Sequence, residues 1–372
     1  MSKQIKLSDV TGIHPDTRTH NPTRELVLPR CSIGVEVELE NITNMSNATS
    51  NLDLWNLETD GSLRNNGMEF ISKVVRGADI ITALTQLEDT LKRRNPQYEP
   101  SSRTSVHIHI DVRNYTVDKL LNLCVVYAIF ERALFNYVGE ERAYSNFCVP
   151  FYQSDGAVRT VSLINSDSAH NISVGLSTPK YTALNLAPSR TQGSVEFRQH
   201  AGTANKVELL KWINILMSLK RYVNNYNGTS QDIIDSVCEK GVTFYKDVFR
   251  EHLPVYNESR LVKDMVAGAR VAQEILYTNI RKHKGKNRPN QKESLFYKLN
   301  KDNIRKDWVF PSSNAKVKTA SDIEQPMNIP RGVHRRADIA NTPLSGLSAA
   351  QQVQWESLSR TLNDNDTTGE ND

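Results

Sequence analysis

The sequence predicts an α+β fold, in which a strand-rich sheet packs on helices. Short segments between residues 26 and 226 alternate apolar and polar residues with a period of two, which is typical of strands with one face in a core. Segments with apolar residues at helical spacing lie between these strands. Over residues 231–282 the pattern is helical, with no further alternating strand.

The elements begin after a polar start. Residues 1–25 are aperiodic, so we expect a leader that is disordered or laid over the surface, with order beginning near Leu26. SIGVEVELEN (32–41) and GMEFISKVV (67–75) are predicted strands, and residues 78–94 are a predicted helix. One stripe of that helix carries Ile80, Leu84, Leu87 and Leu91.

The remaining predicted strands surround a long helix. TSVHIHIDV (104–112) alternates like the first strand. Residues 117–139 are apolar nearly all round, which indicates a buried central helix. KYTALNLAP (180–188) and SVEFRQHAG (194–202) are predicted short strands.

These elements form one predicted domain, residues 26–228. It ends with a helix over residues 204–226, whose apolar face is expected to carry Val207, Leu210, Ile213 and Met217. Residues 229–306 are a predicted helical appendage. Residues 307–372 are a predicted extended or disordered tail with one short helix near residues 348–362.

Charge is distributed unevenly along the chain. Residues 281–306 contain ten Lys or Arg against two acidic residues, a surplus of +8, whereas the whole chain carries +4. The rest is therefore about −4 (4 minus 8), and the sequence pI of about 8.7 does not by itself indicate nucleic-acid binding.

Composition argues against several classes of protein. With 38% hydrophobic and 24% charged residues and a mean hydropathy of −0.51, the chain is typical of a soluble protein. No apolar run reaches the ~18 residues of a membrane span, and the first residues lack the apolar core of a signal peptide, so we expect a cytoplasmic protein. Without a CxxC pair, the four cysteines are expected to be reduced, buried thiols. They are Cys31, Cys124, Cys148 and Cys238.

Ligand-type side chains share the polar face of the predicted strands. Alternation groups Glu36, Glu38 and Glu40; His107, His109 and Asp111; and Glu196, Arg198 and His200. Asp60, in an Asp-Gly turn, and Glu69, at a strand start, lie between the first two groups. A solvated face would explain one such strand. Lysine, however, the usual residue of a solvated strand face, is absent from all three alternating segments.

This pattern indicates a metal site. Neighbouring carboxylates repel each other unless cations neutralise them, and Mg²⁺ or Mn²⁺ suits a set rich in oxygen ligands better than zinc, since there is no thiolate. Carboxylates with a histidine and an arginine also suit phosphoryl transfer. The chain has neither a GxxxxGK[ST] nor a GxGxxG motif, so a nucleotide would be held through its metals.

Five motifs follow one another along the chain, namely GVEVE, DGSLRNNGMEF, SVHIHID, KYTALNL and SVEFRQHAGT, the last before a Trp-containing helix. In this order they resemble the amidoligase family of carboxylate-amine ligases. The resemblance covers about residues 30–225. It implies a glutamine synthetase-like fold with a curved, mainly antiparallel half-barrel sheet, shared with glutamate-cysteine ligase, and makes residues 26–228 a catalytic domain.

The resemblance also implies a reaction. Such ligases form an acyl phosphate from a carboxylate and ATP, with two or three Mg²⁺ or Mn²⁺ ions, and an amine then displaces the phosphate to leave an amide. The implied metal ligands are Glu36, Glu38, Asp60, Glu69, one or both of His107 and His109, and Glu196. Glu36 and Glu38 match carboxylates on separate metals, and Asp60 and Glu69 complete the shell of the first. Arg198 matches the arginine that contacts the transferring phosphate.

Other positions have plain structural alternatives. Between the two histidines we prefer His107 as ligand, because it lies earlier in the strand, with His109 behind it. Glu40 has no counterpart in the family and is expected to be solvated. Arg198, Glu69 and Arg64 are the candidate catalytic residues, although Arg64 could simply be an exposed turn residue.

Three further residues are candidates for ligand binding. Tyr181 and Asn185 are expected to bind the nucleotide together with Arg198, although Asn185 could instead satisfy backbone groups. Arg142 could contact substrate, but capping the C-terminus of the long helix through the helix dipole is favoured.

The residues alone leave two other functions open. The same carboxylates could serve a metal-dependent hydrolase or nuclease with residues 281–306 on a nucleic acid, or the fold could be a non-catalytic binding protein. Arg198 beside Glu196 favours nucleotide phosphate chemistry, and the completeness of the site argues against a lost activity. The expected partners are ATP, a carboxylate and an amine, either of which can belong to a peptide or protein. A membrane is not expected.

Overall fold

The computed structural model describes residues 4–17, 21–43, 51–95, 98–255, 257–277 and 295, all within the first of two units of the chain, Met1–Ala320. The predicted tail, its short helix and all of the basic segment except Leu295 lie outside these residues.

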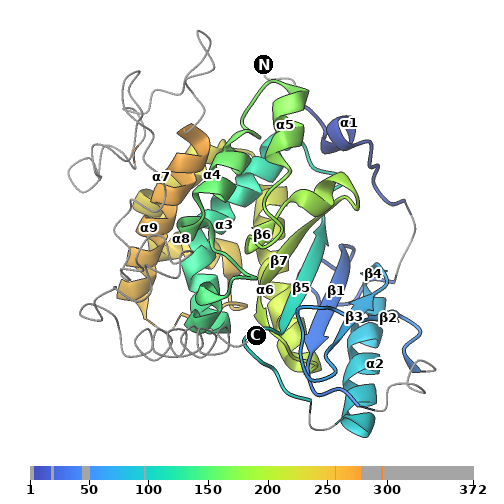
Figure 1. The fold of residues 1–372 in the computed structure, drawn as a ribbon. Helices are drawn as coiled ribbons and strands as arrows, with labels where there is room; N and C mark the ends of the chain where they lie inside the picture. Colours follow the sequence, from blue (N-terminus) through green and yellow to red (C-terminus); the bar gives the residue numbers. More distant parts are fainter. Residues whose placement is uncertain are drawn as a thin grey trace, which may run out of the picture. The chain divides into compact units, whose positions relative to one another are not determined.

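A seven-stranded open sheet organises the described fold (Figure 1). Its strands are β1 (Ser32–Leu39), β2 (Trp55–Glu58), β3 (Met68–Ser72), β4 (Val75–Arg76), β5 (Ser105–Asp111), β6 (Leu184–Asn185) and β7 (Ser194–Ala201). They lie in the order β2-β3-β1-β5-β7-β6, and β4 pairs with the start of β1. Each of these pairings is antiparallel. The predicted α+β class with a mainly antiparallel sheet is confirmed.

Helices pack on the apolar face of this sheet and on one another. They are α1 (Leu7–Thr11), α2 (Ala78–Arg94), α3 (Val117–Val138), α4 (Asp155–Ser162), α5 (Ala169–Gly175), α6 (Lys206–Asn225), α7 (Ser230–Lys240), α8 (Val242–Phe249) and α9 (Glu258–Tyr277). The indole Nε1 of Trp55 on β2 donates to the carbonyl of Ala83 on α2 at 2.8 Å. Toward the other end of the strand order, the ring of Trp212 on α6 packs on His200 of β7. The predicted stripe of α2, Ile80, Leu84, Leu87 and Leu91, is fully buried.

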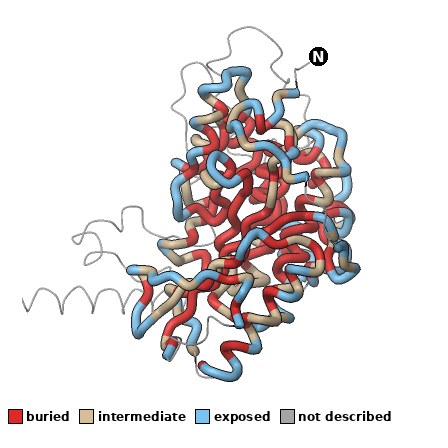
Figure 2. Tube along the Cα trace, turned by 90° about the vertical axis from the view of Figure 1, so that its right-hand side faces the viewer, coloured by how far each residue is buried: buried red, intermediate tan, exposed pale blue. Residues whose placement is uncertain are grey.

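The predicted central helix is α3. Sixteen of its 22 residues are buried, and buried segments fill the middle of the fold (Figure 2). Among the described helices α3 is the one long and apolar enough to cross a membrane, judged by length and composition only, and 78% of its most apolar window is buried inside the protein. The sequence prediction of a buried central position is therefore confirmed.

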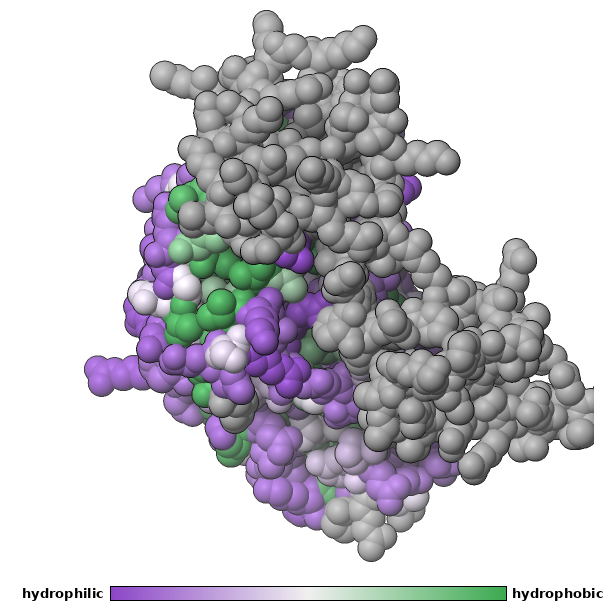
Figure 3. Space-filling model, turned by 90° about the vertical axis from the view of Figure 1, so that its left-hand side faces the viewer, coloured by the Kyte–Doolittle hydropathy of each residue, from purple (hydrophilic) through white to green (hydrophobic). Residues whose placement is uncertain are grey.

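The helices after α6 pack directly on α3. Gly268 of α9 approaches so closely that a Cβ there would lie 2.4 Å from the carbonyl oxygens of Ala128 and Ile129. The ring of Phe130 contacts Phe249 of α8 with centroids 5.1 Å apart. The helical prediction for residues after 230 is confirmed as far as Tyr277. Figure 3 views the side that carries α9, where a hydrophobic area lies among hydrophilic residues.

The polar start of the chain is more ordered than expected. Helix α1 buries Leu7, which is 1% exposed, and the backbone N–H of Leu7 donates to the carbonyl of Tyr115 at 2.9 Å. Val117 in turn donates its N–H to Ile5. The prediction that order begins near Leu26 is wrong, because one apolar side chain and two backbone hydrogen bonds attach this segment to the start of α3.

Two further details of the helix and strand predictions are wrong. Val207, the second residue after the N-cap, is 58% exposed, because the buried side of α6 begins with Leu209 and Trp212. Strand β6 is only Leu184–Asn185. The sequence analysis also did not predict β2, α4 or α5, since their short segments carry no sustained periodicity. Of the four cysteines, all are free; three are buried and Cys238 is half-buried.

Candidate metal centre and substrate cavity

Strand register brings the predicted ligand residues into one row across the sheet. Glu38 of β1 lies opposite Glu69 of β3, and Glu36 lies opposite His107 of β5. Further along, Glu196 of β7 lies between His109 of β5 and Asn185 of β6. We call Glu36, Glu38, Glu69, His107, His109 and Glu196 the strand floor. The expectation that alternating residues of separate strands meet on one face agrees with this register.

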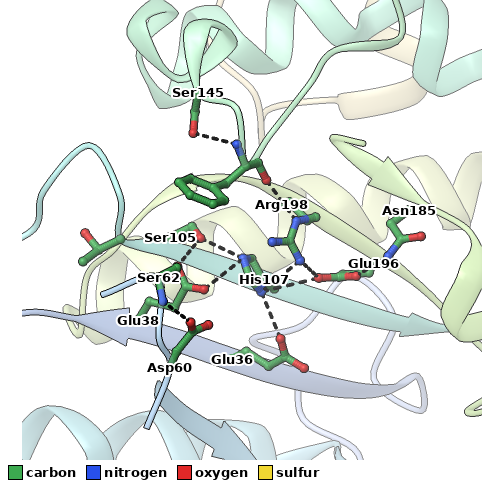
Figure 4. Close-up of polar contacts among 12 residues, drawn as sticks. Glu36, Glu38, Asp60, Ser62, Ser105, His107, Ser145, Asn185, Glu196 and Arg198 are labelled. Carbon is green, nitrogen blue, oxygen red and sulfur yellow. Dashed lines mark hydrogen bonds and ion pairs between the residues drawn. The ribbon is translucent and has the colours of Figure 1, made fainter. Parts of the chain in front are cut away.

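His107 is at the centre of the strand floor (Figure 4). Its Nδ1 lies 2.9 Å from Glu36 Oε2 and 3.4 Å from Glu196 Oε1. Its Nε2 lies 3.8 Å from Glu38 Oε1 and 2.7 Å from the hydroxyl of Ser105. That hydroxyl donates to Glu38 Oε2 at 2.6 Å. Each nitrogen atom of this imidazole therefore lies within 4 Å of at least one carboxylate: Nδ1 is near Glu36 of β1 and Glu196 of β7, and Nε2 is near Glu38 of β1.

Two groups of three ligand atoms can each hold a cation. Glu36, His107 and Glu196 form one group, and Glu38, Glu69 and His107 form the other, with the ligand atoms of each group within 4.8 Å of one another. Carboxylate oxygens with one imidazole are a donor set that Mg²⁺ or Mn²⁺ accepts. His107 belongs to both groups, whereas His109 belongs to neither.

The charges of the strand floor are balanced only in part. Burial would raise the pKa of Glu36, but hydrogen bonds from His107 and His109 outweigh it and leave the pKa below its usual range. In contrast, burial and repulsion from Glu36 and Glu38 raise the pKa of Glu69 to about 8. Within the described part of the chain, no positive charge thus balances the carboxylates at the Glu69 end of the floor, and a bound divalent cation would relieve the repulsion between them.

His109 belongs to the floor, and Asp60 lines the same cavity. His109 Nε2 is 3.0 Å from Glu36 Oε1. Burial works to lower the pKa of His109, but the hydrogen bond and charge of Glu36 raise it overall. Asp60 accepts the backbone N–H of Ser62 at 2.6 Å, and this bond lowers the pKa of Asp60.

Glu196 is held by two side chains. Asn185 Nδ2 donates to Glu196 Oε2 at 2.7 Å, and Nη1 of Arg198 donates to Glu196 Oε1. The same Nη1 lies 3.5 Å from His107 Nδ1, so the guanidinium borders the first group of ligand atoms. Thr178 fixes Asn185, because its hydroxyl donates to Asn185 Oδ1 at 3.0 Å. The structural alternative for Asn185 is also realised, since its Oδ1 accepts the N–H of Ala187.

A cavity of about 740 Å³ lies over the floor. Besides the floor it is lined by Asp60, Ser62, Arg103, Phe147 and Arg198, and by residues of the segment 177–192, namely Ser177, Thr178, Lys180, Tyr181, Asn185, Ala187, Pro188, Arg190, Thr191 and Gln192. We call these residues of the segment the loop wall. The cavity volume falls within the range of about 300–1,000 Å³ that is usual for small-molecule sites.

The cavity contains functional candidates that the sequence analysis missed. Arg103, Lys180 and Arg190 add positive charge to it. The stretch from Ser168 to Val195 contains no Asp or Glu, which was a signal in the sequence for a cationic surface. Ser105 was also missed, although it stands two residues before His107 in the same alternation.

Two predicted candidates lie elsewhere. Arg64 is exposed and is not among the described residues that line the cavity; its Nη1 lies near the carbonyls of Gly61 and Leu63. The expectation of a solvated Glu40 is wrong, since Glu40 is 5% exposed and its Oε1 accepts the N–H of Arg64 at 2.8 Å.

Three other predicted positions also turn away from the cavity. Asp111 is bound by Nε and Nη2 of Arg113 at 2.9 and 3.0 Å. The side chain of His200 packs on Trp212 of α6, because a bulge in β7 reverses the alternation after Arg198. The favoured role of Arg142 as a cap of α3 is wrong, because its guanidinium bonds carbonyls of the sheet.

These observations define a class of protein: an α+β fold with a candidate metal centre on an open antiparallel sheet. The sheet carries clustered carboxylates, a shared histidine and an arginine, and a cavity lies over them. The particular family follows from comparison. A family model described as "Putative amidoligase enzyme" matches residues 30–220, about half of the chain, and the chain belongs to this family. The resemblance drawn from five motifs is thereby confirmed. The family's description names an enzyme of amide-bond formation. No curated protein matches the chain.

Proposed function

We propose that this protein is an ATP-dependent carboxylate-amine ligase that forms an amide through an acyl phosphate, on a glutamine synthetase-like half-barrel. The observation that carries the proposal is the convergence of Arg198 with two overlapping groups of oxygen ligands on His107, inside one cavity. The family assignment supports the amide-forming class. We also propose a cytoplasmic location, on the basis of the composition of the sequence.

The residues fit two or three Mg²⁺ or Mn²⁺ ions. Glu36 and Glu196 would hold one ion and Glu38 and Glu69 a second, and His107 would complete one of these two sites at a time, because a neutral imidazole has one free nitrogen lone pair. Asp60 lines the same cavity and can contribute a further oxygen. When bound, the ions would neutralise the phosphate oxygens of ATP and withdraw electron density from the transferring phosphorus. The raised pKa of Glu69, to about 8, supports this fit, since a cation removes the repulsion that raises it.

The reaction balances as two substitutions. A carboxylate oxygen of the acid attacks the γ-phosphorus, and the bond from that phosphorus to the β–γ bridging oxygen breaks, so ADP leaves. The amine nitrogen then attacks the acyl carbon, the carbon–oxygen bond to phosphate breaks, and the amine releases one proton to solvent. The products are an amide, ADP and inorganic phosphate.

Arg198 serves the first of these substitutions. Its guanidinium stabilises the charge that develops on the transferring phosphoryl group, as arginines do in other phosphoryl-transfer sites. Glu196 and the carbonyl of Phe147 hold it in place, at Nη1 and Nε respectively. Asn185 orients Glu196 from the opposite side.

The loop wall provides for the anionic substrates. Lys180, Arg190 and Arg103 line the same cavity as the acidic floor. An anionic substrate in the cavity would be attracted to these cationic side chains and to the metal ions bound on the floor. Tyr181 contacts the ring of Phe147 with centroids 5.4 Å apart, and this aromatic pair offers a surface for a nucleobase.

Hydroxylamine provides a test that does not need the natural amine. The full chain is incubated with Mg·ATP, hydroxylamine and a panel of carboxylic acids, including acidic amino acids and short peptides. We expect a hydroxamate, ADP and phosphate in equal amounts with one class of acid, and none of them without Mg²⁺ or with the R198Q variant. Arg221→Gln is the control, because Arg221 lies outside the cavity lining and donates to the carbonyl of Val248.

Two results would overturn the proposal. One is cleavage of DNA, RNA or peptide with Mg²⁺ or Mn²⁺ and without nucleotide, which would make the cluster a hydrolase centre. The other is failure of Mg·ATP to bind to the protein in calorimetry, because an acyl phosphate cannot then form.

A further inference from the structure

Arg142, a buried arginine that does not line the cavity, binds the backbone of β7, the strand that carries Arg198. Arg142 is 3% exposed and comes from the short 3₁₀ helix after α3. Its Nε donates to the carbonyl of Gln199 at 3.0 Å, and its Nη2 donates to the carbonyl of Arg198 at 3.3 Å. Its Nη1 reaches the carbonyls of Ser102 and Thr104 at 3.4 and 3.5 Å. A buried cation that contacts four backbone carbonyls holds several segments of chain at once.

The carbonyls of Arg198 and Gln199 need this partner because of a β-bulge. Ile108 pairs with Phe197, but Val106 pairs with His200, so two residues of β7 stand opposite the single residue between them on β5. Such a bulge interrupts the ladder and leaves backbone groups without strand partners, and an unpaired buried carbonyl is costly. A planar guanidinium donates to two neighbouring carbonyls in one fixed geometry, whereas an ammonium group on a flexible chain can donate to both but does not fix their orientation.

The same short segment also holds the side chain of Arg198. Nε of Arg198 donates to the carbonyl of Phe147 at 3.1 Å, and the N–H of Phe147 donates to the hydroxyl of Ser145 at 3.2 Å (Figure 4). Residues 142–147 therefore fix Arg198 at its backbone carbonyl and at its guanidinium. Nη1 of Arg198 donates to Glu196, which belongs to the first group of metal-ligand atoms.

We propose that Arg142 is a positioning residue, which holds the bulge of β7 and thereby fixes the guanidinium of Arg198 in the orientation that receives an anionic oxygen of the phosphate class. The identity of that ligand rests on the proposed function. The fixed orientation of Arg198 is a property of the chain itself and can be tested without any ligand.

The test uses the full chain with Arg142→Gln, Arg198→Gln and the double variant, and Mg·AMP-PNP as the probe in calorimetry. We expect each single variant to bind the probe about 10- to 100-fold more weakly, as for other residues that orient a binding group. The double variant should bind no more weakly than R198Q alone, because both substitutions remove one shared interaction. Arg142→Lys should lie between R142Q and the wild type, since it keeps the charge but not the fork. Arg221→Gln, which also loses a bond to a carbonyl, should bind like the wild type.

A ligand-free measurement separates this inference from the proposed function. The Nε–H signal of Arg198 in the NMR spectrum should be protected from exchange in the wild type and in R221Q, and should lose protection in R142Q. The inference is overturned by wild-type affinity in R142Q, by losses that multiply in the double variant, or by an unchanged Arg198 signal. If R142Q does not fold, R142K decides by the same criteria. If the wild type itself binds no nucleotide, the proposed function fails and the NMR signal alone decides whether Arg142 positions Arg198.

Discussion

The strand floor and the loop wall face the same cavity but are built on different physical grounds. The floor consists of residues at alternate positions of paired strands, where register alone decides which side chains meet. The loop wall comes from residues 177–192, in which only Leu184 and Asn185 form a strand, and its shape depends on contacts such as that of Thr178 with Asn185. The difference teaches that periodic structure carries positional information in the sequence, whereas a loop receives it from its neighbours.

The largest expected effect tests whether the floor is one metal centre. His107→Ala removes the one ligand shared by both groups, so we expect Mn²⁺ affinity, measured by calorimetry and by electron paramagnetic resonance, to fall by at least about 100-fold. Hydroxamate formation should fall with it, because no step of the proposed reaction proceeds without neutralised phosphate oxygens.

His200→Ala is the matched control for that substitution. The sequence alternation places His200 on the same face as Arg198, whereas the bulge turns it toward Trp212. We expect Mn²⁺ affinity to be unchanged in H200A and only the melting temperature to fall. Equal losses of Mn²⁺ affinity in both variants would show that the floor is not organised as the register indicates.

These two histidines also mark how far the sequence could predict the site. Glu36, Glu38, His107 and Glu196 were predictable because each stands in an unbroken alternation on a strand. His200 was not, because a bulge adds one residue and nothing in its composition announces this.

The remaining misses have the same kind of cause. Glu40 and Arg142 are ordinary polar residues by sequence, and only tertiary contacts bury them against a turn and a bulge. Likewise, α2 and α3 were predictable because one has a clear apolar stripe and the other is apolar nearly all round, whereas α4 and α5 are too short to show a period. The cations of the loop wall have no periodic signal at all.

The next effect concerns the segment at Phe151 and Tyr152, which Glu131 attaches to α3. The carboxylate of Glu131, buried in α3, accepts the backbone N–H groups of Phe151 and Tyr152. These residues are close to Val149, which forms a β-bridge with Thr182, in the same segment as the loop wall. Burial raises the pKa of Glu131 from 4.5 to about 7, despite these bonds. Because the folded-state pKa is the higher one, this carboxyl favours folding fully below pH 4.5, and that contribution is lost as pH rises through about 7.

We therefore expect the free energy of unfolding to fall by about 3 kcal/mol between these limits on account of Glu131. The fall should be absent in Glu131→Gln. Urea unfolding of both proteins in EDTA at pH 5 and pH 8 checks this as a difference of differences, so that Glu69 and Glu274, whose pKa values are also raised to about 8, cancel. The same pH dependence in wild type and E131Q would contradict the assignment.

A smaller effect tests the charge of the wall. Lys180→Met removes one cation that faces the acidic floor, and we expect the affinity for Mg·AMP-PNP to fall about tenfold at low salt and less at high salt, because the interaction is screened. Lys73→Met, at an exposed position outside the cavity lining, is the control and should bind like the wild type. A loss in K180M that does not depend on salt would mean that Lys180 acts through packing on Tyr181, over whose ring its Nζ lies, rather than through charge.

The smallest expected effect asks whether the wall and the floor are independent. Thr178 of the wall donates to Asn185 Oδ1 and accepts the N–H of Leu186, and Asn185 donates to the floor at Glu196. Thr178→Val leaves that N–H unpaired and frees Asn185, so we expect a stability loss of about 1–3 kcal/mol and a Mn²⁺ affinity about threefold lower. Thr182→Val is the matched control, because the Thr182 hydroxyl donates only to the carbonyl of Pro179 in the same segment, and it should leave Mn²⁺ affinity unchanged. Thr178→Ser, which keeps the hydroxyl, should restore both quantities. If T178V loses stability and yet binds Mn²⁺ as the wild type does, the floor is set by strand register alone and the wall only encloses it.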